Sequence, residues 1–365
     1  WGPPYLTDAN GRDTSEAAYY LSCNRGKHSV AVDITQPDGQ SIVRALARKA
    51  DVFVENFKVG GLAKYALDYA AIAAVNPRIV YCSITGFGQD GPYADRAGYD
   101  FIIQGMAGFM SVTGERDDAP GGGPQKAGVA IVDLVTGLFA STGIVAALAE
   151  RERTGRGRHF DVALFDAAVS MMSVMNLNYL VTGRAPGRAG NAHQNIVPYQ
   201  SFACADGYVI LAVGNDSQFA KFCEAAGVSY ANDPRFSKNA DRVRHREMLV
   251  PMLDALMRTK RQHEWLALLE PLGVPCGPIN TIDQVFADPQ VIARGMRLEL
   301  PHPLANVVPQ VSSPFFYDRV NSHSERAPPL LGQQTAKVLG DALGYDETRI
   351  ADLKRRRIIE VSQDV

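Results

Sequence analysis

One carboxylate stands out because its surroundings in the sequence are otherwise apolar. The segment AGVAIVDLVTGLFASTGIVAAL covers residues 127–148, and Asp133 is its one charged residue. Burying a carboxylate without a partner is unfavourable, so such a residue needs a capping or chemical role. We expect Asp133 to be the N-cap of a helix, where backbone N–H groups keep it ionised. In a cleft that excludes water, the same carboxylate would attack an activated acyl group.

Three other side chains are candidates for a chemical role. Asp161 and Asp166 lie five residues apart, a spacing that shares neither a helix face nor a strand face, so both are interpreted as structural. His193, in the segment GNAHQN, is a candidate acid–base group. Ordinary loop hydrogen bonds are the preferred interpretation of this histidine.

Basic residues cluster near the predicted strand ends. Any one of them fits a solvated surface, but as a set around one sheet edge they would hold a polyphosphate ligand. The set consists of Arg25, Lys27, Lys58, Lys64 and Arg96. The basic runs at 150–159 and 353–357 are interpreted instead as helix-end solvation and compensation of helix dipoles.

The elements that must position these residues follow from hydrophobic spacing. Strands are predicted at 29–34, 51–56 and 78–84, and Asp38 and Asp68 are predicted N-caps of the two helices between them. This order predicts an α/β fold with a doubly wound parallel sheet. Such sheets bind ligands beyond the carboxyl ends of their strands, here at 56–58 and 85–87.

The second half of the chain predicts a separate domain. A long helix is expected from Asp133 to Arg153, and a glycine-rich stretch at 183–195 leads into strand 207–213 and several short helices. We expect a large domain in 1–185, a smaller α+β domain in 186–300, and a return to the large domain in 301–365. Two closing helices in that last segment should pack on the large domain.

A dinucleotide-binding fold is the alternative raised by the segment GFGQDG at 86–91, which has the form G-x-G-x-x-G. The context does not support it, because Pro92 follows at once and no helix is predicted to begin there. We interpret the segment as a glycine-rich loop that lets a ligand approach the backbone. A nicotinamide-dependent oxidoreductase therefore remains a minor alternative.

Composition narrows the class of protein. The 365 residues are 46% hydrophobic and 21% charged with a formal net charge of −2, which gives no reason to expect nucleic acid or membrane as a partner. The histidines show no metal-ligand spacing, so we expect no metal site.

The apolar segment at 127–148 predicts a core helix better than a membrane span. Scattered, unpaired cysteines indicate reduced thiols and a cytoplasmic protein. They are Cys23, Cys82, Cys204, Cys223 and Cys276.

Seven motifs occur together in one order that is typical of a known family. They are NRGKHSVAVD, DVFVENF, NPRIVYCSITGFGQDGP, RAGYD, GVAIVDLVTG, RTGRG and PPLLGQQT. The chain thereby resembles the class III CoA-transferases, the formyl-CoA transferase-like family, over almost its whole length. It is most similar to the branch that moves CoA between succinyl-CoA and dicarboxylic acids such as glutarate.

The resemblance implies roles for particular residues. It makes Asp133 the catalytic nucleophile. A small-domain loop that closes over the acyl group corresponds to Gly190–Gln194, with Gly190, Asn191, His193 and Gln194 as substrate contacts, although it lacks the tetraglycine of the formyl-CoA enzymes. The implied CoA contacts are Val32, Asp33, Ile34, Thr35, Asn56, Phe57, Lys58, Lys64, Ala97, Gly98, Tyr99 and Asp100.

The resemblance also implies an architecture and a mechanism. It implies a Rossmann-like large domain, an interlocked homodimer, and acyl-CoA as a substrate with no prosthetic group. The family begins with a further strand–helix unit, carrying a glutamine and an arginine, that has no counterpart in residues 1–365. Asp133 would form an acyl anhydride and then an aspartyl-CoA thioester. Backbone N–H groups of glycine loops and of the helix start would stabilise the oxyanions.

Two further functions are alternatives to CoA transfer: a racemase, which differs at one residue, and a non-catalytic CoA-binding protein, which an experiment distinguishes. Racemases of the same fold read RAGHD where this chain has Tyr99, and a phenol is a poor base near neutral pH, which favours transfer over α-proton abstraction. A non-catalytic CoA-binding protein would bind acyl-CoA without forming a covalent adduct.

Overall fold

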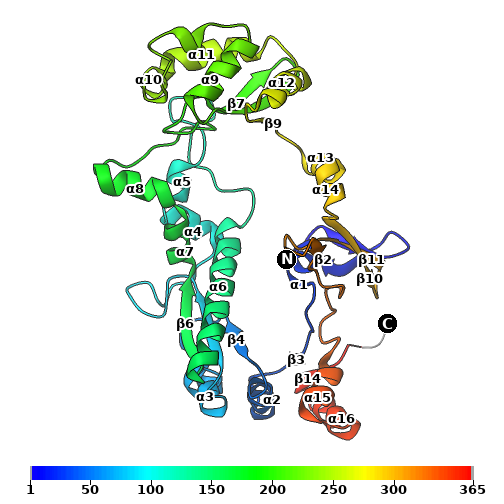
Figure 1. Ribbon diagram of the computed structural model, residues 1–365. Helices are drawn as coiled ribbons and strands as arrows, with labels where there is room; N and C mark the ends of the chain where they lie inside the picture. The colour runs from blue at the N-terminus through cyan, green and yellow to red at the C-terminus, as the bar shows by residue number, and fades with distance from the viewer. Residues whose placement is uncertain (1, 363–365) are drawn as a thin grey trace. The chain divides into compact units, whose positions relative to one another are not determined.

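The computed structural model describes residues 2–362, and its central feature is a three-stranded parallel sheet (Figure 1). The strand order is β4 (Val52–Glu55), β5 (Val80–Thr85) and β6 (Arg158–Ala163). The helices α2 (Pro37–Ala47) and α3 (Tyr69–Val75) precede the first two of these strands. The predicted alternation of helices with parallel strands is confirmed for this part of the chain.

The first predicted strand is not part of that sheet. Only Ala31–Val32 is extended, as β3, and it pairs antiparallel with β14 (Ile359–Glu360) near the other end of the chain. The Asp33 N–H donates to the Ile358 carbonyl at 2.8 Å. The prediction was wrong because the C-terminal strand, and not β4, satisfies the backbone groups of this segment.

The caps of the first two helices differ in part from the prediction. Helix α2 has Gln36 as its N-cap and Pro37 as its first residue, so Asp38 lies inside the first turn and the predicted N-cap was wrong. Proline at this position needs no partner for a backbone N–H and is already set for helical geometry. Asp68 is the N-cap of α3 as predicted, although its side chain makes no capping hydrogen bond.

The closing helices pack on α2, as expected. They are α15 (Thr335–Leu343) and α16 (Glu347–Arg355). Leu339 and Leu353, one from each helix, share a buried apolar cluster with Ile42 of α2. Burial of these side chains stabilises the return of the chain to its N-terminal part.

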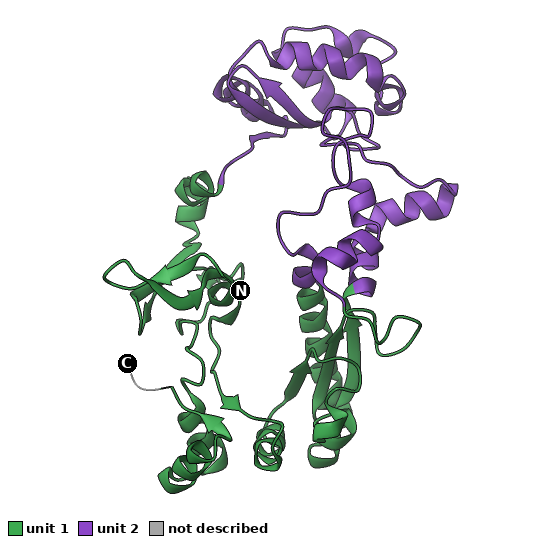
Figure 2. Cartoon of the chain, turned by 180° about the vertical axis from the view of Figure 1, so that it is seen from behind, with its two compact units in different colours: residues 1–97, 136–164, 282–365 green, residues 98–135, 165–281 purple. Residues whose placement is uncertain are grey.

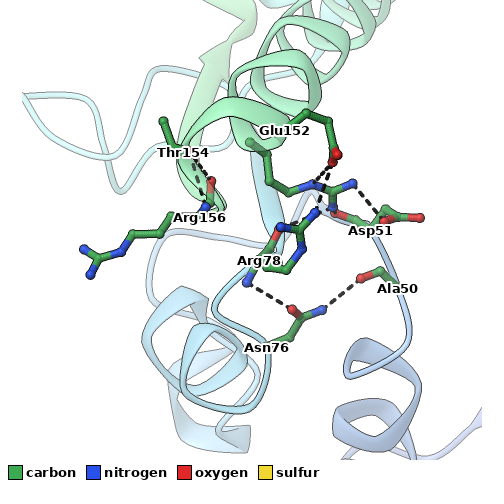
Figure 3. Close-up of polar contacts among 8 residues, drawn as sticks. Ala50, Asp51, Asn76, Arg78, Glu152, Thr154 and Arg156 are labelled. Carbon is green, nitrogen blue, oxygen red and sulfur yellow. Dashed lines mark hydrogen bonds and ion pairs between the residues drawn. The ribbon is translucent and has the colours of Figure 1, made fainter.

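Helix α6 (Ile131–Thr154) carries Asp133 and is anchored at its far end. The buried Arg151 pairs with Asp51 at 3.0 Å, and Arg78 pairs with Glu152 at 3.0 Å. Figure 3 shows Glu152 beside Arg78 and Asp51, which belong to the segments that precede β5 and β4. The helix predicted from Asp133 to Arg153 is therefore confirmed within two residues at each end.

The chain divides into two compact units, coloured separately in Figure 2. Unit 1 comprises residues 1–97, 136–164 and 282–365, and unit 2 comprises 98–135 and 165–281. One boundary falls inside α6, between Val135 and Thr136. The remaining elements of unit 1 are β1 (Tyr5–Thr7), β2 (Asp13–Ala17), α1 (Ala18–Asn24), η1 (Ala63–Tyr65), α13 (Ile282–Ala287), α14 (Pro289–Ala293), β10 (Arg297–His302), β11 (Asn306–Val311), β12 (Phe316–Tyr317) and β13 (Val320–Asn321).

Unit 2 contains an antiparallel sheet covered by helices. The sheet consists of β7 (Tyr199–Cys204), β8 (Gly207–Ala212) and β9 (Cys276–Pro278). Its buried apolar core runs from Val197 to Val274, inside the segment 186–300 that was predicted as the small domain. The helices of unit 2 are α4 (Asp100–Met106), α5 (Phe109–Val112), α7 (Leu164–Met171, whose first residue is assigned to unit 1), α8 (Ser173–Thr182), α9 (Asp216–Ala225), η2 (Tyr230–Asn232), α10 (Asn239–Arg244), α11 (Arg246–Met257), α12 (Gln262–Leu269) and η3 (Glu270–Leu272).

Helix α6 is also long and apolar enough to cross a membrane, with 24 residues and a window of mean hydropathy 1.9. The bent pair α7–α8 passes the same test jointly. Only 22% of the α6 window is buried within the described residues. The apolar face of α6 is therefore largely uncovered by its own chain.

Candidate active site

Asp133 is the third residue of α6, and its side chain is exposed. The prediction that it is the helix N-cap was wrong, because the helix already begins at Ile131. Exposure leaves the carboxylate open to attack a ligand. A carboxylate in the first turn of a helix is also favoured by the partial positive charge of the helix N-terminus.

Asp100 performs the capping role that was predicted for Asp133. Its Oδ2 accepts hydrogen bonds from the N–H groups of Val132, at 2.8 Å, and Asp133, at 3.3 Å. Its Oδ1 accepts from the side-chain amide of the buried Gln104, whose own oxygen accepts from the Ala127 N–H at 2.9 Å. This chain of hydrogen bonds fixes the start of α6 on α4, and thereby fixes the position of Asp133.

The surroundings raise the pKa of Asp133 above its usual value. Desolvation by neighbouring protein atoms is the main cause, and the nearby Asp100 carboxylate adds like-charge repulsion. These two effects oppose the helix dipole, which favours the ionised form of Asp133. A raised pKa makes the carboxylate a stronger base and a better nucleophile once it is ionised.

Space is available one turn further along α6. Gly137 lies four residues after Asp133 and therefore on the same helix face. A Cβ at this position would have no heavy atom within 4 Å. Glycine inside a helix costs about 1 kcal/mol relative to alanine, and at Gly137 the helix surface is left open.

We predict that Asp100→Asn shifts the acid limb of the pH–activity profile to lower pH. On the expectation that Asp133 is the nucleophile, activity falls as the pH drops through its raised pKa. Removing the Asp100 charge lowers that pKa part of the way, since desolvation remains. The measurement is kcat/KM across the acid range, with Asp95→Asn on the exposed neighbouring loop as control. An unchanged acid limb in a folded Asp100→Asn protein would contradict this explanation of the pKa. Asparagine keeps one acceptor oxygen in place of two, so either the Gln104 amide or the N–H groups at the start of α6 lose their acceptor, and a stability loss of about 1–3 kcal/mol is expected.

The first predicted CoA-contact segment, Val32–Thr35, begins with the last residue of β3 and continues into a tight turn. The Asp33 carboxylate accepts hydrogen bonds from the Thr35 N–H at 2.9 Å, the Thr35 hydroxyl at 2.6 Å and the Gln36 side chain at 3.0 Å. These bonds lower the pKa of Asp33, with the Thr35 hydroxyl as the main cause. These hydrogen bonds therefore fix the conformation of the turn that is the predicted CoA contact.

The second segment, Asn56–Lys58, follows β4 at its carboxyl end, as predicted. The Phe57 N–H donates to Glu55 at 2.7 Å, and the Phe57 ring is 47% exposed, which leaves a flat apolar surface for a ligand. Lys58 starts a turn through its carbonyl, which accepts from Gly61 at 2.8 Å. Lys64 follows in η1 with its amine over the Tyr65 ring.

The structure gives the remaining predicted cations different neighbours. Arg25 donates to the Ser324 carbonyl and Lys27 to Asn24. Arg96 stacks on the rings of Phe87 and Tyr93, the latter at 4.5 Å. Of the five basic residues predicted to hold a polyphosphate, Lys58 and Lys64 both lie in the segment that follows β4.

The third segment, Ala97–Asp100, leads into α4. Tyr99 is the N-cap residue of this helix and is 62% exposed, while Asp100 makes the contacts to α6 described above. The sequence motifs located Asp100 as an expected CoA contact, and they did not indicate its hydrogen bonds to α6. The buried Gln104, one turn further, was missed because nothing in the sequence marks its partners.

The predicted substrate loop, Gly190–Gln194, is held to the body of unit 2. Its Gly190 N–H donates to the Gly114 carbonyl at 3.2 Å, and the half-buried Arg246 donates to the carbonyls of His193, at 3.0 Å, and Gln194, at 2.9 Å. Asn191 and Gln194 line a pocket of about 850 Å³ in this unit. Arg246 was not found from the sequence.

Gly190 has a local reason to be glycine. Its φ is +60°, a left-handed conformation that side chains disfavour, and a Cβ would lie 2.7 Å from the carboxylate oxygens of Glu115. His193 behaves as an ordinary loop histidine: its Nδ1 accepts from the Asn195 N–H at 3.0 Å, and its ring packs on Tyr199.

The other candidates from the sequence lie on other elements of the fold. Asp161 lies on β6 and Asp166 in the first turn of α7. After the GFGQDG loop the next helix is α4, which begins only at Asp100, so no helix N-terminus follows the loop for a dinucleotide. Among residues 2–362 the structure brings together no group of three side chains suited to a metal ion.

Comparison with known proteins identifies the class. Residues 4–335 match CoA-transferase family III. A succinate–glutarate CoA-transferase of Agrobacterium fabrum is 47% identical over 349 residues, which cover 95% of this chain and 86% of the relative. The human succinyl-CoA:glutarate CoA-transferase is 38% identical, with 99% and 80% covered. A crystal structure of a CaiB/BaiF family protein from Brucella suis has a TM-score of 0.80 at 45% identity, with 94% and 88% covered.

The mixed α/β fold and these matches define an enzyme that transfers coenzyme A. The chain belongs to CoA-transferase family III. The resemblance inferred from the ordered motifs is confirmed.

Proposed function

We propose that this protein moves CoA from succinyl-CoA, or a similar acyl-CoA, to a free dicarboxylic acid such as glutarate. The named activities of the relatives support this choice of substrates. The observation that carries the mechanism is Asp133 itself: an exposed carboxylate in the first turn of α6, positioned by Asp100, with a raised pKa.

In the proposed mechanism Asp133 attacks the thioester carbonyl of the acyl-CoA, and the C–S bond breaks to release CoA thiolate. The product is a mixed anhydride between Asp133 and the acyl group. The thiolate then attacks the Asp133 carbonyl, which releases the first acid and leaves an aspartyl-CoA thioester. The incoming carboxylate reverses both steps, so the enzyme and all atoms are restored without a redox change or an energy source.

The first turn of α6 is a poor oxyanion site. The N–H groups of Val132 and Asp133 donate to Asp100, and that of Leu134 donates to the Ala130 carbonyl. Within the described residues the N–H of Gly128, in the preceding loop, makes no hydrogen bond. We therefore place oxyanion stabilisation on glycine-loop amides such as Gly128, and not on the helix start.

The direct test is mass spectrometry of the protein incubated with succinyl-CoA and then with glutarate. We expect a succinyl or CoA adduct on the peptide that contains Asp133, and its loss when glutarate is added together with formation of glutaryl-CoA. Deuterated solvent supplies a second measurement: a transferase leaves the α-protons in place, whereas a racemase exchanges them. CoA binding without any adduct would contradict the proposal.

We also propose that two copies of the chain form a homodimer through the uncovered face of α6. Leu134, Leu138 and Val145 are exposed and lie along one side of that helix. Exposed apolar surface of this extent is typical of a subunit interface. We expect a mass in sedimentation equilibrium of twice the 39.6 kDa chain, and a shift toward the single chain in Val145→Lys. A wild-type mass of 39.6 kDa would contradict the dimer.

The domain layout, the CoA contacts and the cellular location are part of the same proposal. We propose a Rossmann-like large domain with the small domain in 186–300, supported by the parallel sheet and by the separate core of that segment. We place the CoA contacts on Val32–Thr35, Asn56–Lys58, Lys64 and Ala97–Asp100. All five cysteines are free thiols, which supports a cytoplasmic location.

A further inference from the structure

Four consecutive basic residues at the end of α16 divide into two pairs. Arg355 forms an ion pair with Asp352, and Arg356 with Asp38 and Asp352. Lys354 and Arg357 make no side-chain hydrogen bond or ion pair within residues 2–362. Arg355 and Arg356 therefore have acidic partners, whereas the exposed Lys354 and Arg357 keep their charges available for a ligand.

Lys354 and Arg357 share a pocket with the first predicted CoA-contact segment. The pocket has a volume of about 510 Å³ and is lined by Val32 and Asp33 on one side and by these two basic residues and Glu360 on the other. The antiparallel pairing of β3 with β14 holds the two sides together. The contacts that create this pocket join parts of the chain more than 300 residues apart.

The backbone at Arg357 is unusual for a residue with a side chain. Its φ is +57°, directly after the C-cap Arg356. The Ile358 N–H donates to the Leu353 carbonyl and the Arg357 N–H to the Lys354 carbonyl, both at 2.9 Å. This is the Schellman pattern, in which glycine is the usual residue at the left-handed position. Backbone geometry at this position therefore favours glycine and gives no reason for an arginine.

The pocket also contains two acidic residues. The Asp33 carboxylate already accepts three hydrogen bonds from Thr35 and Gln36, and Glu360 is exposed on β14. A lining with both charges suits a ligand that carries phosphates together with hydrogen-bond donors. The adenosine end of CoA has this composition, with a 3′-phosphate, a diphosphate and the amino group of adenine.

We propose that Lys354 and Arg357 bind a phosphate group at the adenosine end of CoA. Arginine can donate two parallel hydrogen bonds to a phosphate, and lysine adds a point charge. The inference rests on the proposed function, because Val32 and Asp33 are among the CoA contacts proposed there.

Arg357→Gly tests this proposal without damage to the fold. Glycine adopts the left-handed conformation freely, so we expect a higher Tm together with a Kd for CoA raised by about tenfold, measured by titration calorimetry. A purely structural role cannot produce both effects. Lys354→Ala should weaken binding in the same direction. Arg355→Ala, which alters the neighbouring ion-paired residue, is the matched control and should bind CoA as the wild type does.

The same titrations with 3′-dephospho-CoA identify the phosphate. If Arg357→Gly weakens CoA but not 3′-dephospho-CoA, the contact is with the 3′-phosphate; an equal loss for both ligands assigns it to the diphosphate. Wild-type affinity for CoA in both Arg357→Gly and Lys354→Ala overturns the inference. The proposed function is tested separately by the acyl adduct on Asp133. Failure of the phosphate-binding inference can therefore be distinguished from failure of the proposed function.

Discussion

Asp133→Asn is expected to lower CoA transfer by about 10⁴-fold or more while the protein stays folded. An amide cannot form the anhydride, and removing a covalent nucleophile typically causes losses of this size. Stability should not fall, because the carboxylate is already unfavourable where it lies. Its pKa is raised in the folded state, so the ionised form is less favourable there than in the unfolded chain.

The pH dependence of this stability difference has a definite sign. A carboxyl whose folded pKa exceeds its unfolded pKa reduces the stability of the fold as the pH rises from the unfolded pKa through the folded pKa, and this loss is complete above the folded pKa. At neutral pH we therefore expect Asp133→Asn to have a Tm equal to or above that of the wild type, with the gap closing in acid as Asp133 becomes protonated. Thermal unfolding followed at several pH values measures it.

Two comparisons make this experiment specific. Asp133→Ala gives the same activity loss without the option of deamidation back to aspartate. Asp166→Asn alters an exposed acid in the first turn of α7 and should retain transfer. Transfer by Asp133→Ala within tenfold of the wild-type rate would remove this residue from the mechanism and the proposed intermediates with it.

Short sequence patterns predicted helices and strands well where residues close in the sequence determine the local structure. Two signals predicted the strands at 52–55 and 80–85 and helix α6. They are the spacing of apolar residues and the residues that end an element, such as proline, and both act within a few residues. The chemical isolation of Asp133 was likewise visible in its own segment. These features needed no knowledge of distant contacts.

Contacts between distant residues account for the errors at Asp133 and at the first predicted strand. Whether Asp133 or another group caps α6 depends on Asp100, which lies 33 residues earlier and reaches the helix start through the fold. The partner of Val32 is Ile359, so no local pattern indicates that this strand leaves the parallel sheet. Lys354 and Arg357 look like Arg355 and Arg356 in the sequence, and only the fold shows which of them meet acids.

Gly39→Ala is expected to impair both stability and CoA binding. A Cβ on this buried residue of α2 would lie 1.9 Å from the Asp33 carbonyl oxygen and 2.7 Å from the Asp33 carbonyl carbon. Backbone atoms cannot rotate away as a side chain can, so the turn at Val32–Thr35 must move. Overpacking of this kind costs about 1–3 kcal/mol, and the moved turn is a proposed CoA contact, so we expect KM for succinyl-CoA to rise about tenfold while KM for glutarate changes little.

Gly340→Ala is the matched control, because both residues are helical glycines but their surroundings differ. At Gly340 of α15 the nearest atom to an added Cβ is the Tyr345 carbonyl oxygen, at an ordinary contact distance of 3.6 Å. Alanine is favoured over glycine inside a helix by about 1 kcal/mol, so this variant should be more stable than the wild type with unchanged kinetics. Urea unfolding measures the opposite signs of the two effects. If Gly39→Ala were also stabilised, the close approach of α2 to Asp33 would not exist in solution, and the proposed CoA contact at this turn would lose its structural basis.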